Sequence, residues 1–261
     1  MKRILVFVLS ASLTLFACST PPPTVKQETL MVFAAASLTD AFDEIGKAFE
    51  ADYPGVTVKL NFGASQALRT QIEQGAQADV FASANPKEMD ALMAGNFVDS
   101  QSPQIFLTNQ LVVIMPAHNP ARVENLVDLA QDGIKLVLAA EEVPVGNYSL
   151  KAFEKLDQEF GNDFKNKTLE NVVSYENTVK QVVAKVQLGE ADAGIVYISD
   201  TVAVPELTKI DIPMENNVVA EYLLAALVQS KRPELARAFI SYVLSTDGQF
   251  ILKKWGFSPV H

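Results

Sequence analysis

The stretch MVFAAASLTDAF, residues 31–42, joins an apolar strand to a helix with no loop between them. MVFAAA is typical of a short buried strand, and apolar residues from Leu38 to Phe49 recur at the spacing of one helix face. Ser37 lies where the strand passes into the helix. Because ligands of open α/β sheets bind beyond the carboxyl ends of the strands, this junction is a candidate binding position.

The same alternation continues on both sides of the middle of the chain. In the first half, strands are predicted at 56–63 and 78–85, and helices at 65–75 and 86–95. In the second half, strands are predicted at 109–116, 134–140, 170–175 and 193–200, and helices at 148–160, 178–189, 233–244 and 248–256, with 141–147 as a loop. This order predicts an α/β protein divided into two αβ lobes over residues 30–107 and 108–216, and the β-α-β-α-β run of the first half predicts a parallel sheet with right-handed crossovers.

The N-terminus has the pattern of an export signal. Lys2 and Arg3 precede an apolar run that is too short to span a bilayer, so residues 1–17 are predicted to be a signal peptide. The run ends in LFAC, which resembles a bacterial lipoprotein signal in which Cys18, the only cysteine, is lipidated. The alternative is ordinary cleavage that leaves a free thiol. Residues 18–29 are proline-rich and polar, which predicts a tether that holds the protein outside the cytoplasm, in the periplasm or on the outer face of the membrane.

Composition limits the partners. The chain has 261 residues, of which 49% are hydrophobic, and this is sufficient for a sizeable core. Its formal net charge is -10. Binding to nucleic acid, or to an anionic membrane through charge alone, is therefore not expected.

Neutral hydrogen-bond donors recur where predicted strands meet helices. The candidates are the hydroxyls of Ser37, Ser65 and Tyr197 and the main-chain amides of Val145 and Val179. Helix N-termini carry unpaired N–H groups and partial positive charge, so they attract anions without lysine or arginine. The alternative for each serine is a simple N-cap role, which needs no ligand.

Five segments, read together, resemble a known family. AAASLTDAF, NFGASQAL, ADVFASAN, VPVGNY and GEADAGIVY are similar in order and spacing to the periplasmic molybdate-binding proteins of bacterial ABC importers. The resemblance implies the type II periplasmic-binding-protein fold, in which a ligand cleft lies between two αβ lobes joined by a two-strand hinge. It further implies that residues 217–261 return to the first lobe, and that a monomer without a cofactor delivers molybdate or tungstate to the membrane subunits of an ABC permease.

The resemblance also assigns the ligand shell residue by residue. The two serine hydroxyls of the family fall on Ser37 and Ser65, its loop amide on Val145, its helix-start amide on Val179 and its tyrosine hydroxyl on Tyr197. These groups hold the oxyanion, with no direct metal ligand from the protein. The family commonly reads E-N-V-R where this chain reads ENTVK (176–180), so Thr178 is the alternative to Val179. In EYLLA (221–225) a leucine replaces a common proline, which is expected to alter the hinge or strand and leave the shell unchanged.

A bare tetrahedral dianion offers only acceptors, so a shell of donors suits it, whereas a pocket carboxylate would repel it. Sulfate has the same shape and charge and is an alternative ligand, as is tungstate as the preferred one. Ferric binding would need clustered tyrosine, histidine or carboxylate groups, and the tyrosines are scattered along the sequence. An organic acid would favour an arginine clamp, but Arg69 is expected to face solvent.

A serine hydrolase is the remote alternative. It needs a base beside its nucleophile, and the only histidines, His118 and His261, lie near no nucleophile motif. The motif G-x-S-x-G is absent from the sequence. An enzyme is therefore not expected.

Overall fold

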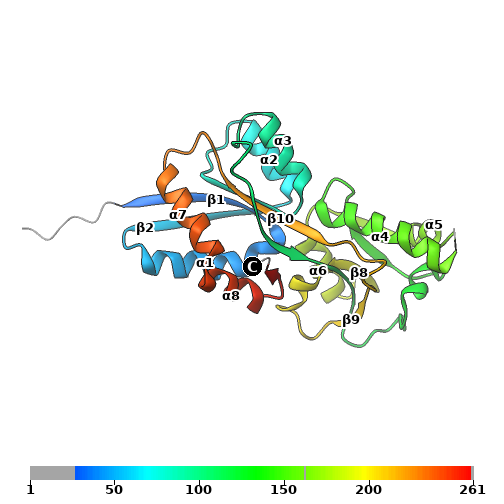
Figure 1. Ribbon diagram of the computed structural model, residues 1–261. Coiled ribbons are helices and arrows are strands. Elements are labelled where there is room, and N and C mark those ends of the chain that lie inside the picture. The colour runs from blue at the N-terminus through cyan, green and yellow to red at the C-terminus, as the bar shows by residue number, and fades with distance from the viewer. Residues whose placement is uncertain (1–26, 162, 260–261) are drawn as a thin grey trace, which may run out of the picture.

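The computed structural model describes residues 27–161 and 163–259. The predicted signal peptide, Cys18 and most of the tether lie outside the described residues, as does His261. Figure 1 shows two lobes side by side, each built around its own sheet with helices against it. Within the described part of the chain, no helix is both long and apolar enough to cross a bilayer.

The first lobe contains a six-stranded sheet in the order β11-β4-β10-β3-β1-β2. The strands are β1 (Glu28–Ala35), β2 (Val56–Gly63), β3 (Val80–Ser83), β4 (Gln104–Asn109), β10 (Ala220–Ala226) and β11 (Ser258–Pro259). β1 pairs in parallel with β2 and β3, as predicted. The sheet as a whole is mixed, because β10 comes back from the other lobe and inserts antiparallel between β3 and β4.

Helices cover both faces of this sheet (Figure 1). They are α1 (Thr39–Asp52), α2 (Ser65–Glu73), α3 (Pro86–Ala94), α7 (Pro233–Leu244) and α8 (Thr246–Lys254), with a 3₁₀ turn, η1 (Ala36–Leu38), between β1 and α1. β1 sends alternate side chains to opposite faces. Val32 and Ala34 pack in one apolar cluster with Phe42 of α1 and Phe239 of α7, and Phe33 packs in a second cluster under α2 and α3.

The second lobe contains a five-stranded sheet in the order β7-β6-β8-β5-β9. Its strands are β5 (Leu111–Met115), β6 (Leu136–Ala139), β7 (Val172–Glu176), β8 (Ala193–Tyr197) and β9 (Thr208–Asp211). Its helices are α4 (Pro144–Phe160), α5 (Phe164–Glu170) and α6 (Val179–Gln187), with the 3₁₀ turns η2 (Leu126–Ala130) and η3 (Ile198–Thr201). β6 pairs in parallel with β7 and β8, but β5 runs antiparallel to β8 and β9, so this sheet is also mixed.

Helix α4 begins four residues before the predicted start at Tyr148, because part of the expected loop is its first turn. Pro144 occupies the first helical position, where its fixed φ and missing N–H are tolerated. Gly146 allows the helix to approach the end of β6. A Cβ at this glycine would lie 2.1 Å from the carbonyl oxygen of Ala140 and 2.5 Å from that of Ala139.

The chain crosses between the lobes twice, and one asparagine ties the two crossings together. Gln110 separates β4 from β5, and residues 212–219 lead from β9 back to β10. The side chain of Asn217 accepts from the Leu111 N–H at 3.0 Å and donates to the Leu111 carbonyl at 2.9 Å. The two crossing segments are thereby held side by side at the hinge.

Candidate functional site

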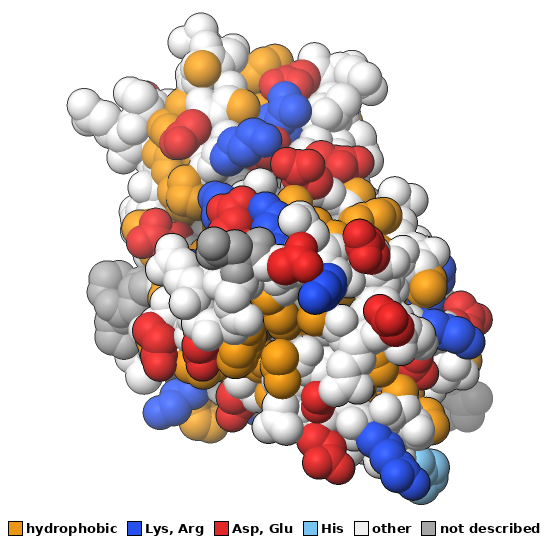
Figure 2. All heavy atoms as spheres, turned by 90° about the vertical axis from the view of Figure 1, so that its right-hand side faces the viewer, with side chains coloured by type: hydrophobic (Ala, Val, Ile, Leu, Met, Phe, Trp, Pro, Cys, Tyr) orange, Lys and Arg blue, Asp and Glu red, His pale blue; other side chains and the backbone are white. Residues whose placement is uncertain are grey.

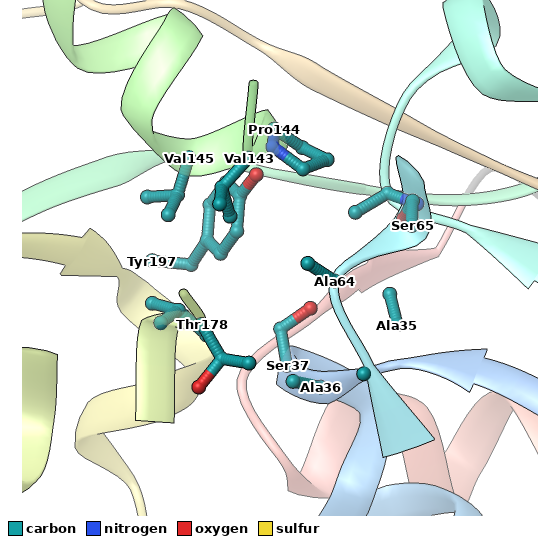
Figure 3. Close-up of a pocket in the computed structure, with 13 residues that line it drawn as sticks. Ala35, Ala36, Ser37, Ala64, Ser65, Val143, Pro144, Val145, Thr178 and Tyr197 are labelled. Carbon is teal, nitrogen blue, oxygen red and sulfur yellow. The ribbon is translucent and has the colours of Figure 1, made fainter. Parts of the chain in front are cut away.

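A small pocket lies between the lobes, where three helix starts and the end of β8 meet the ends of β1 and β3. It is lined by thirteen residues: Ala35, Ala36, Ser37, Gly63, Ala64, Ser65, Ala84, Val143, Pro144, Val145, Thr178, Val179 and Tyr197. All five residues predicted from the sequence are among them. Figure 3 shows Tyr197, Val143 and Val145 of the second lobe facing Ser37, Ala64 and Ser65 of the first.

The pocket is small. It contains about 230 Å³ of empty space, including its open mouth. Drug-sized ligands occupy pockets of roughly 300–1,000 Å³. The space therefore suits a ligand of a few atoms.

The Tyr197 hydroxyl is buried and makes no hydrogen bond of normal geometry to a described residue, although the Tyr222 hydroxyl is near enough to help raise its pKa. The tyrosine ends β8, and its side chain is 1% exposed. Burial is the main reason that its pKa is raised well above the usual value of 10, so the phenol keeps its proton at neutral pH. Because native proteins rarely leave a buried hydroxyl unpaired, this donor calls for a ligand.

Ser65 is the first residue of α2, whose N-cap is Ala64 and lacks a side-chain cap. The alternative that this serine is an N-cap is therefore wrong. Instead, the Ser65 Oγ accepts from the Ala84 N–H at 3.0 Å. Since that amide can only donate, the hydroxyl proton of Ser65 is left for an acceptor in the pocket.

Ser37 is also not an N-cap. It lies inside η1, which begins after Ala35 without a side-chain cap. Its Oγ lies 2.8 Å from the Oη of Tyr222, a fully buried residue of β10 that does not line the pocket. Either oxygen can be the donor of this bond. The sequence reasoning missed Tyr222: the tyrosines are scattered along the sequence, but the fold brings the rings of Tyr197 and Tyr222 together edge to face, with centroids 5.9 Å apart.

The helix starts around the pocket add main-chain donors. η1, α2 and α4 have no side-chain cap, so their first-turn amides are not used by a capping residue. Val145 is the second residue of α4. In α6 the N-cap is Thr178, whose Oγ1 accepts from the Gln181 N–H at 3.3 Å, and Val179 is the first helical residue. Thr178 and Val179 both line the pocket, and Val179 is the residue at the helix-start position.

No charged side chain lines the pocket. Arg69, which was expected to face solvent, lies in ion pairs with Glu73 at 2.6 Å and Glu88 at 2.7 Å, with its side chain 26% exposed. The face of the second lobe in Figure 2 carries acidic and basic side chains interspersed. Salt screens such surface charges over roughly 8 Å, so the charges on this face add little to the field inside the pocket.

An ion pair joins the lobes beside the pocket. Lys180, next to the lining residue Val179, reaches Asp40 of α1 at 2.7 Å and Asp200 of η3 at 3.5 Å. Burial raises the pKa of Asp200 to about 6, although Lys180 acts to lower it. Burial acts to lower the pKa of Lys180, but the charges of Asp200 and Asp40 outweigh this and raise it.

The alternative functions would need a histidine base or a group of metal ligands at the site. His118 is exposed in a turn. Over the described ranges, 27–161 and 163–259, no group of three or more histidine, cysteine, aspartate or glutamate side chains is placed to hold a metal ion.

Comparison with known proteins identifies the family. Residues 30–258 match the family described as bacterial extracellular solute-binding protein. The chain belongs to this family. Among its relatives, the molybdate-binding protein ModA of Mycobacterium tuberculosis is 37% identical over 243 residues, covering 93% of this chain and 89% of the relative. A putative ABC transporter substrate-binding lipoprotein of Bacillus subtilis is 29% identical, covering 98% of each chain.

Solved structures of other solute-binding proteins share the fold. The substrate binding domain of a putative molybdenum ABC transporter from Clostridium difficile has a TM-score of 0.67 and 32% identity, covering 90% of this chain and 100% of that domain. The sulfate-binding protein SubI of Mycobacterium tuberculosis has a TM-score of 0.81 and 20% identity, covering 90% of this chain and 88% of its own. The type II periplasmic-binding-protein fold predicted from the sequence is confirmed.

We predict that Lys180→Met makes stability depend more strongly on pH. A raised carboxyl pKa costs stability as pH rises from the unfolded value to the folded value, because the folded state then holds the extra proton. Removing Lys180 raises the pKa of Asp200 further, so the loss of unfolding free energy relative to wild type should be larger at pH 8 than at pH 5. The added difference should be about 1 kcal/mol for each unit of added pKa shift.

The measurement is urea unfolding of the ligand-free protein at both pH values. Lys185→Met is the matched control on the same helix, where Lys185 pairs with Glu176 at 2.7 Å. The pKa of Glu176 is lowered, against the effect of burial, by its bonds to Lys185 and Ser174, so Glu176 is ionised at both pH values. Equal losses at pH 5 and pH 8 for Lys180→Met would contradict the coupling.

Proposed function

We propose that this solute-binding protein captures molybdate, and also tungstate, as a bare tetrahedral dianion in the pocket between its lobes. Three hydroxyls and the first-turn amides of Val145 and Val179 are the donors. The observation that carries the proposal is the buried, unpartnered Tyr197 hydroxyl beside a pocket lined by Ser37 and Ser65. The names of the relatives, and the size of the pocket, support an ion of this class.

The chemistry of the pocket fits an anion that only accepts hydrogen bonds. The Tyr197 and Ser65 hydroxyls each have a proton to donate, Ser37 has one when its oxygen accepts from Tyr222, and no carboxylate lines the pocket to repel a dianion. A hydrogen bond to a charged group contributes about 1.5–3 kcal/mol, so a few such bonds suffice for tight binding without a cationic side chain.

Delivery follows from closure of the lobes. Ser37 and Ser65 belong to the first lobe, whereas Val145, Val179 and Tyr197 belong to the second, so a bound anion bridges them and stabilises the closed form. The closed form is then the species that the membrane subunits of an ABC permease recognise. In this role the protein is a monomeric carrier and catalyses no reaction.

Sulfate is the second candidate, because the fold is shared with a sulfate-binding protein and the anion has the same shape and charge. That structural likeness is at 20% identity and bears on the fold alone. Molybdate is favoured because a molybdate-binding relative is 37% identical over 93% of the chain.

Titration calorimetry with molybdate, tungstate, sulfate and phosphate tests the ligand. Molybdate and tungstate should bind much more tightly than sulfate, and phosphate, which is partly protonated at neutral pH, should bind most weakly. Molybdate binding no tighter than that of sulfate would reject the assignment in favour of the second candidate.

Tyr197→Phe should weaken molybdate binding by roughly ten- to a hundredfold, because one hydrogen bond to the dianion is lost. The ligand-free variant should be as stable as wild type or more stable, since removing an unpartnered buried hydroxyl relieves its desolvation cost. Calorimetry and urea unfolding measure the two effects. Tyr175→Phe, whose side chain is 55% exposed, is the control and should change neither. A Tyr197→Phe variant with full affinity removes this residue from the shell.

The anchoring of the protein is also a proposal, since Cys18 lies outside the described residues. We expect Cys18 to carry the lipid that tethers the protein to the outer face of the membrane, in line with the lipoprotein name of the Bacillus subtilis relative. Labelled palmitate should be incorporated into wild type and be absent from Cys18→Ala when both are expressed in bacteria. Equal labelling of the two would show that the chain has no such anchor.

A further inference from the structure

Tyr222 lies behind the pocket wall in a fixed position. Its side chain is fully buried, and its ring packs edge to face against those of Phe106, Tyr197 and Phe257, with centroids 6.4, 5.9 and 5.8 Å away. Its hydroxyl reaches the Ser37 Oγ at 2.8 Å across 185 positions of sequence. Since Tyr222 does not line the pocket, it can act on a ligand only through its neighbours.

Two hydroxyls of the described residues near helix starts are directed at main-chain carbonyls. Thr39 donates to the Ala36 carbonyl at 2.7 Å, and Ser149 donates to the Val145 carbonyl at 2.7 Å. Such local bonds consume the hydroxyl proton. The described contacts of Ser37 include no bond of this kind, and its partner is another hydroxyl, which can donate as well as accept.

The direction of the bond between Ser37 and Tyr222 decides whether Ser37 can serve an anion. A hydroxyl has one proton, so Ser37 donates to the ligand only when its Oγ accepts from Tyr222. Burial raises the pKa of Tyr222 far above 10, against the opposing effect of the Ser37 bond, so the phenol keeps the proton that it must give.

Ser65 offers a parallel on the same lobe. Its Oγ accepts from the Ala84 N–H at 3.0 Å, which can only donate, so the Ser65 proton is free for the pocket. We propose that Tyr222 is a positioning residue that does for Ser37 what the Ala84 amide does for Ser65: it donates to the serine oxygen and directs the serine proton toward the bound oxyanion. This proposal rests on the proposed function of the pocket.

The chain Tyr222 to Ser37 to anion is expected to be cooperative, because each hydrogen bond polarises the next in a buried site. Tyr222 also stands where the chain re-enters the first lobe, beside a shift in the register of β10 against β4 between Tyr222 and Leu223. Its ring touches Tyr197 of the other lobe. The side chain of Tyr222 thus contacts both Ser37 and Tyr197, two of the three residues whose hydroxyls are the proposed ligand donors.

A double-mutant cycle tests the proposal by calorimetry with molybdate on wild type, Tyr222→Phe, Ser37→Ala and the double variant. Tyr222→Phe keeps the ring and removes only the donor, so we expect binding to weaken about three- to tenfold in the wild-type background. In the Ser37→Ala background the same change should alter affinity by less than twofold, because the group through which Tyr222 acts is gone. Tyr242→Phe, a ring packed on Phe49 away from the pocket, should change nothing.

Each other outcome overturns the proposal. Equal weakening in both backgrounds means that Tyr222 acts through packing or through Tyr197, and no weakening in either means that it does not position Ser37. If Ser37→Ala binds too weakly for calorimetry, the rise in Tm at tens of millimolar molybdate gives the same comparison. Wild type that fails to bind molybdate overturns the assigned ligand instead; the cycle is then run with whichever other oxyanion it binds, and binding of none overturns both proposals.

Discussion

The proposed function depends on one constraint, which is that a pocket without charged side chains must present protons inward in order to hold an anion. A hydroxyl or amide can do so only if the rest of the fold does not use its proton first. Around this pocket the fold leaves the starts of η1, α2 and α4 without capping side chains, holds the Ser65 oxygen with a main-chain amide, and buries the Tyr197 hydroxyl with no partner among the described residues. The uncapped helix starts and the unpaired Tyr197 hydroxyl are small local costs in stability that a ligand can offset.

The donors of the pocket are divided between the two lobes. Neither lobe alone holds all of the donors, and the connection between lobes is narrow: Gln110 on one crossing and residues 212–219 on the other, linked through Asn217. The contact between Lys180 and Asp40 adds an ionic link beside the site. A relative motion of the lobes would therefore change the pocket directly.

Local patterns in the sequence predicted much of the fold. β2 and α7 have the predicted bounds because clear alternation and a proline at the first helical position define them. The strands β4 and β9 were missed, since QIFLTN and TKID have weak patterns and gain their order from neighbouring strands. The first turn of α4 was taken for a loop, because only the contact of Gly146 with the end of β6 shows why a helix begins there.

The five pocket residues predicted from the sequence lie at or just after strand ends or begin helices, so their place could be predicted. Tyr222 and Lys180 act across 185 and 140 positions, and no local rule gives such pairs.

Gly146 has a consequence for how this protein can change over time. With carbonyl oxygens 2.1 and 2.5 Å from where a Cβ would stand, every other amino acid is sterically barred from the position unless the helix start moves. Substitution of Gly146 is therefore strongly disfavoured. A related protein that binds a different ligand is expected to differ at the neighbours of this glycine and to keep the glycine itself.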